Sequence, residues 1–61
     1  MIDWTRIVMD LERVYSLAQI GHAVDRDAAS IHRYKMGTAE PKYSTGAALL
    51  SLHTKLAPRS T

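Results

Sequence analysis

The apolar residues near the amino terminus recur three and four positions apart, which places them on one face of a helix. They are Trp4, Ile7, Val8, Leu11, Val14 and Tyr15. Asp3 can cap the first turn through its side-chain oxygen, and Ile2 can pack on Ile7 as a hydrophobic staple. We therefore predict a first helix from about Trp4 to Tyr15.

A capping box begins a second helix directly after this stripe. The Ser16 hydroxyl can accept the Gln19 backbone N–H, while the Gln19 side chain accepts that of Ser16. The apolar residues that follow at helical spacing are Leu17, Ile20, Ala23 and Val24. Because no apolar residue continues them through Asp25-Arg26-Asp27, this helix is expected to run from about Leu17 to Val24.

A third helix is predicted from Ala28 to Met36. Asp27 is a favourable N-cap, and Gly37 suits the left-handed position that commonly follows a helix. The inward face of this helix is narrow and consists of Ile31, Tyr34 and Ala28. Its remaining side chains are left for solvent or for a partner.

Pro41 separates the third helix from a fourth. Proline lacks an amide donor and pushes the preceding residue toward an extended conformation, so residues 37–43 are expected to form a loop. Ser44 or Thr45 then caps the fourth helix, and Ala47 and Leu50 lie beside its inward stripe. That stripe consists of Leu49, Leu52 and Leu56. We predict a compact all-α domain over residues 1–57, with four helices or alternatively five, and a frayed tail over residues 58–61.

Cysteine is absent, so neither a disulfide nor a cysteine-ligated zinc can stabilise this fold. A chain of 61 residues forms one domain whose core leaves little net stability, which association with a second copy would increase. No apolar run approaches the ~18 residues needed to span a bilayer, and the first residues lack the pattern of a signal peptide. We therefore expect a cytoplasmic protein without membrane contact.

Charge is unevenly distributed along the chain, although the formal net charge is only +2. Residues 1–25 carry two arginines against four carboxylates, a balance of −2. Residues 26–61 carry six basic side chains against two acidic ones, a balance of +4. An acidic partner is therefore expected to face the second half, and nucleic acid is the commonest such partner.

Two short helices joined by about three residues form the arrangement in which one helix enters the major groove of DNA while the other holds it. Here the motif comprises LAQIGHAV at residues 17–24 and DAASIHRYKMG at residues 27–37. These residues resemble the helix-turn-helix of the lambda-repressor-like, Cro-type regulators. The resemblance extends through Glu40-Pro41 and the residues 48–52.

The resemblance implies a lambda-repressor-like fold with a specific core. Ile20 and Val24 would be buried in the first motif helix, and Gly21 would let the two helices approach closely. Ile31 and Tyr34 would anchor the recognition helix.

The chain departs from the family pattern at two turn positions. The family usually has glycine where Asp25 stands and an aliphatic residue where Arg26 stands. Aspartate tolerates the left-handed conformation better than most residues, so the first departure is compatible with the turn.

The resemblance also implies which side chains contact DNA. The family's base-reading positions fall on Ala28, Ala29, His32 and Arg33. Arg33 can pair bidentately with O6 and N7 of guanine, whereas the two alanines can touch only thymine methyl groups. The expected phosphate contacts are Gln19, Arg26, Lys35, Lys42 and Tyr43. For Tyr43, simple packing is an equal alternative.

We expect no enzymatic activity, cofactor, small-molecule ligand or metal. His22, His32 and His53 lack the spacing and the partner residues of a metal site. Asp10 and Glu12 are two residues apart on a helix, so they point to different sides and cannot act as a paired acid and base.

Two classes of function remain. The first is a sequence-specific, double-stranded-DNA-binding regulator of a bacterium or phage, which blocks polymerase by occupying an operator. It would act as a weak symmetric homodimer, formed on DNA through Ala47, Leu50 and Ala57. The second is a helical protein-interaction module that has lost DNA affinity, which is favoured by the alanines at the start of the third helix and by Asp25 and Asp27 nearby.

Overall fold

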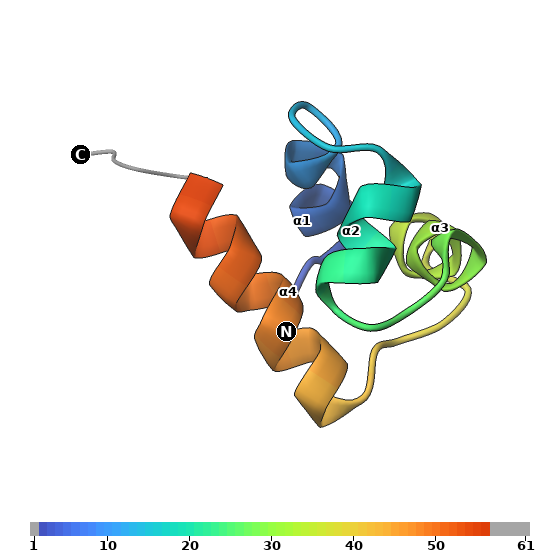
Figure 1. Cartoon of the computed structure of the whole chain (residues 1–61). Helices are drawn as coiled ribbons and strands as arrows, with labels where there is room; N and C mark the ends of the chain where they lie inside the picture. Colours follow the sequence, from blue (N-terminus) through green and yellow to red (C-terminus); the bar gives the residue numbers. More distant parts are fainter. Residues whose placement is uncertain (1, 57–61) are drawn as a thin grey trace.

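The computed structural model describes residues 2–56, which form four α-helices. The helices are α1 (Trp4–Leu11), α2 (Leu17–Ala23), α3 (Ala28–Met36) and α4 (Tyr43–Leu56). In Figure 1, α1, α2 and α3 cluster together, and the longer α4 runs along one side of the cluster. The prediction of a compact all-α fold is confirmed, and the described residues contain no strand.

The core draws side chains from all four helices and from the turn after α2. Its buried members are Ile7, Val8, Leu11, Ile20, Val24, Ile31, Tyr34 and Leu49. Trp4, Tyr15, Leu17 and Leu52 are partly buried and pack against it. The apolar spacing in the sequence therefore identified nearly the whole core, because each helix buries one face and leaves the other to solvent.

The first helix is shorter than predicted, because it ends at Leu11 rather than at Tyr15. The Leu11 carbonyl accepts the N–H groups of both Val14 and Tyr15, which closes a tight turn after the helix. This turn leads to Ser16, whose extended backbone (ψ 164°) starts the capping box of α2. Val14 is consequently 60% exposed instead of lying on the buried stripe.

The fourth helix starts earlier than predicted, at Tyr43 rather than after a cap at Ser44 or Thr45. The Lys42 carbonyl accepts the Gly46 N–H at 2.7 Å, so the first helical bond already spans Tyr43. Thr45 is buried and lies within the helix. Tyr43 is therefore the first helical residue and not part of the loop.

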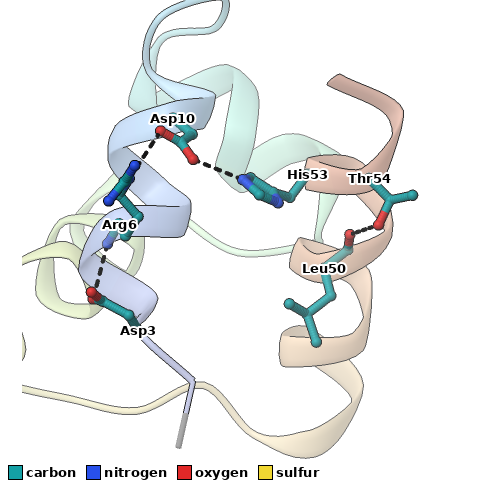
Figure 2. Close-up of polar contacts among 6 residues, drawn as sticks. All are labelled: Asp3, Arg6, Asp10, Leu50, His53 and Thr54. Atoms are coloured by element: carbon teal, nitrogen blue, oxygen red, sulfur yellow. Dashed lines mark hydrogen bonds and ion pairs between the residues drawn. The ribbon is translucent and has the colours of Figure 1, made fainter. Parts of the chain in front are cut away.

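Helices α1 and α4 contact each other near Gly46 and near His53, among other places. Close approach is possible at Gly46, where an added Cβ would lie 3.0 Å from Cη2 of Trp4. Further along, Oδ2 of Asp10 lies 2.9 Å from Nε2 of His53, and Oδ1 of Asp10 lies 3.6 Å from Nε of Arg6 (Figure 2). The hydrogen bond with His53, aided by the charge of Arg6, lowers the pKa of Asp10 below its usual value.

Within residues 2–56, none of the helices combines the length and apolar character required to cross a bilayer.

Candidate nucleic-acid interface

The turn between α2 and α3 is built from backbone hydrogen bonds. The Arg26 N–H donates to the Gly21 carbonyl at 2.7 Å, and the Asp25 N–H donates to the His22 carbonyl at 3.3 Å. Asp25 has a φ of 62°, in the left-handed region. These three features define a Schellman motif, which ends α2 and redirects the chain toward α3. Aspartate thus fills the position for which a glycine would be usual, and Arg26 remains exposed.

A glycine is required at Gly21 because the backbone of this turn passes very close to it. A Cβ at Gly21 would lie 2.5 Å from the carbonyl oxygen of Arg26 and 3.1 Å from that of Asp27. The prediction that a small residue permits close approach is confirmed, and the atoms approached are the backbone leading into α3.

The start of α3 is fixed by Asp27. Its Oδ1 accepts the Ser30 N–H at 3.0 Å, as the sequence predicted for an N-cap. Hydrogen bonds from the side chain and backbone of Ser30 lower the pKa of Asp27, so a negative charge stays at the first turn.

The end of α3 is fixed by a second Schellman motif. Gly37 has a φ of 80°, and the Thr38 N–H donates to the Arg33 carbonyl at 3.0 Å. The helix therefore begins at Ala28 and ends at Met36, as predicted.

One face of α3 is open to solvent. Its exposed residues stand at relative positions 0, 3, 4 and 7, which form one stripe on a helix; they are Ala29, His32, Arg33 and Met36. Three of the four predicted base-reading residues lie on this stripe, whereas Ala28 is half-buried at its edge. Met36, which is 60% exposed, was not predicted as a site residue, although its spacing of seven from Ala29 places it on the same face.

Arg26 lies between the starts of α3 and α4. It lines an open depression of about 520 Å³ together with His22, Asp27 and Ser30. It also lines a second depression, of about 420 Å³, together with Ser44 in the first turn of α4. The structure therefore brings the turn after α2 close to the beginning of α4.

The other predicted phosphate contacts differ in their surroundings. Lys42 and Tyr43 are exposed where α4 begins, and at 92% exposure Tyr43 does not pack into the part of the chain that the structure describes. Gln19 is exposed, and its Oε1 accepts the Ser16 N–H at 2.8 Å, so its amide NH₂ group is the part of the side chain that can donate to a phosphate. Lys35 is held by Glu12, directly after the end of α1, because its Nζ lies 2.7 Å from Oε1 of Glu12.

No match was found when the chain was compared with protein-family models, with curated proteins and with solved structures.

The predicted dimer residues lie on or near an apolar depression beside the first half of α4. Ala47 is exposed, Leu50 is partly buried against the core, and Ala57 lies outside the described residues. The depression has a volume of about 300 Å³, and its apolar lining comprises Ile2, Trp4, Pro41, Tyr43, Gly46, Ala47 and Leu50. The sequence does not predict Ile2 and Tyr43 as part of this surface, because they lie far apart in the chain and come together only in the fold.

Metal-binding geometry is not found in residues 2–56, where no three histidine, aspartate or glutamate side chains gather into a group that could hold an ion.

Proposed function

We propose that this protein is a sequence-specific regulator that binds double-stranded DNA and inserts α3 into the major groove. The observation that carries the proposal is the exposed stripe from Ala29 to Met36, on a helix that the Gly21 turn holds against α2. A helix supported in this way can enter a groove about 12 Å wide without losing its own packing. The resemblance to the Cro-type helix-turn-helix supports the same assignment.

Three residues of the exposed stripe, and Ala28 at its edge, have a role in this proposal. Arg33 reads guanine through O6 and N7, while Ala29 and the edge residue Ala28 contact thymine methyl groups. His32 lies on the same stripe and contacts a neighbouring base edge. Arg33 thereby supplies the strongest base contact in each half-site.

The proposed phosphate contacts come from α2, from the turn after it and from the start of α4. Arg26 lies between the starts of α3 and α4, Lys42 and Tyr43 mark the start of α4, and Gln19 lies in the first turn of α2. The basic balance of residues 26–61 supports this arrangement, because phosphate contacts provide affinity for DNA of any sequence.

We further propose that the regulator is cytoplasmic and acts as a Cro-like repressor in a bacterium or a phage-infected cell. It would bind an operator as a weak homodimer and exclude polymerase. A single α3 contains only one bidentate base reader, so two copies on half-sites about 34 Å apart would double the sequence that is read.

Selection of bound duplexes from a random pool tests the proposal. We expect one recurring duplex, bound at least about 1,000-fold more tightly than random DNA, with an affinity that falls steeply as salt rises. Recovery of no preferred sequence, or an affinity insensitive to salt, would contradict it.

A second candidate function is a protein-interaction module, and the exposed carboxylates of Asp25 and Asp27 favour it. They lie beside the start of α3, where a negative charge repels DNA phosphate. Under this alternative, the random-pool selection yields no duplex and the exposed stripe of α3 is covered by a protein instead.

A further inference from the structure

Lys35 is the basic residue of α3 that the structure ties to another helix. Its Nζ lies 2.7 Å from Oε1 of Glu12, which follows the end of α1, and the two side chains are only 30% and 26% exposed. The Lys35 carbonyl also accepts the Thr5 hydroxyl at 2.7 Å. The residues of α1 and its cap therefore hold both the main chain and the side chain of Lys35.

The position of Lys35 is close to the proposed DNA-binding stripe. It directly precedes Met36, the last residue of the stripe, and at 3.6 residues per turn it lies about 100° around the helix from Met36. A lysine has a flexible four-carbon stem, so an unpaired ammonium at this edge would reach the phosphates that border the groove. Paired with Glu12, the ammonium is turned toward α1 instead.

We propose that Glu12 competes with DNA phosphate for Lys35 and thereby lowers the affinity of the protein for DNA without changing which bases it prefers. This inference rests on the proposed function. Phosphate contacts carry no sequence information, so the contact that Glu12 withholds would strengthen binding to every duplex alike. Glu12 touches no DNA and acts only through Lys35.

The decisive variant is Glu12→Gln, which keeps the shape of the side chain and removes its charge. We expect affinity for the selected duplex and for a random duplex to rise together, by about three- to eight-fold at ~0.1 M salt, as one additional released counterion would give. The slope of log affinity against log salt should become steeper by about 0.9, and the ratio of the two affinities should stay constant. Circular dichroism establishes that the variant is folded.

Asp10→Asn is the matched control, since it raises the net charge by the same amount. Asp10 lies in α1 close to Glu12 in the sequence, but its partners are Arg6 and His53 and not a residue of α3. We expect this variant to change the affinity by no more than about two-fold. The number of phosphates that the protein contacts should stay the same.

Lys35→Gln tests the same pair from the other side. On its own it should leave the salt slope unchanged, and in its presence Glu12→Gln should no longer raise affinity. Lys42→Gln, at a proposed phosphate contact, should instead lower the slope by about 0.9.

Three results would overturn the inference alone: Glu12→Gln behaving like Asp10→Asn, Lys35→Gln lowering the salt slope by itself, or Glu12→Gln raising affinity for only one of the two duplexes. If the wild-type protein binds no duplex, the proposed function fails and the inference fails with it. If the wild-type protein binds DNA but Glu12→Gln does not change its affinity, only the inference fails, and the proposed function stands.

Discussion

Gly21 is the position where the smallest chemical change is expected to disturb the motif most. In Gly21→Ala, the added Cβ would lie 2.5 Å from the Arg26 carbonyl oxygen, a backbone atom held in the turn. We expect a loss of about 1–3 kcal/mol in the free energy of unfolding, the usual cost of overpacking. Urea denaturation followed by circular dichroism measures it.

Gly46→Ala is the matched comparison for this substitution. Its Cβ would meet the Trp4 ring at 3.0 Å, and a side chain can shift more readily than a backbone carbonyl. We expect Gly46→Ala to lower the free energy of unfolding by less than Gly21→Ala does. An unchanged denaturation midpoint for Gly21→Ala would contradict the close approach of the turn.

Arg33 is expected to carry most of the base discrimination. Arg33→Ala should weaken binding to the selected duplex by about 1–3 kcal/mol and relax the choice of one base per half-site. Arg6→Ala removes the same charge from an exposed position on α1 and should affect selected and random duplexes equally and weakly. Electrophoretic mobility shifts measure both. An equal loss on both duplexes for Arg33→Ala would reassign Arg33 to a phosphate contact.

Individual side chains were predictable from the sequence where a local pattern determines their environment. The burial of Ile31 and Tyr34 follows from their spacing alone. The pairing of Lys35 with Glu12 does not, because it depends on how α1 and α3 pack, and the sequence separates these residues by a complete helix and two turns. From the sequence alone, Lys35 is therefore predicted only as a phosphate contact.

Helix boundaries were predictable where the ends carry their own hydrogen-bonding groups. The predicted ends of α3 are both confirmed, because Asp27 and Gly37 act on adjacent backbone atoms. The predicted end of α1 was wrong, since Val14 and Tyr15 continue the apolar spacing although the backbone has already turned at Leu11. Apolar periodicity records which residues could share a face, but not where the chain must reverse.

The contact between α1 and α4 is expected to depend on pH. Because the pKa of Asp10 is lowered in the folded protein from its usual 3.8, the ionised carboxylate favours folding above that pH. This stability is lost as the pH falls through the lowered pKa. The difference in unfolding free energy between wild type and Asp10→Asn should therefore shrink on acidification. Thermal unfolding over a series of acidic buffers measures it, and a difference independent of pH would exclude the link to His53.

At the scale of the whole molecule, we expect two copies to meet on DNA through the apolar depression beside α4. Ala47→Glu places a charge at an exposed residue of this depression. We expect the selected duplex to bind one chain of this variant instead of two, because a charge in an apolar contact loses its hydration. Sedimentation of the DNA complex measures the stoichiometry.

The exposure of Ala47 makes it a cleaner test than Leu50, which also packs against the core. Leu50→Glu would unfold the monomer in part, whereas Ala47→Glu should leave the thermal midpoint unchanged. One chain per selected duplex in the wild type would exclude the dimer.

The packing of Trp4 against Gly46 also gives the protein a built-in optical reporter. Trp4 is the single tryptophan of the chain, and its ring lies between α1 and α4 while lining the apolar depression. Its fluorescence emission therefore arises from one defined place, where the first and last helices meet. Separation of α4 from α1 would shift that emission to longer wavelength as water reaches the indole, whereas a second chain seated in the depression would shift it to shorter wavelength. The unlabelled wild-type protein can thus distinguish these two events in a single spectrum.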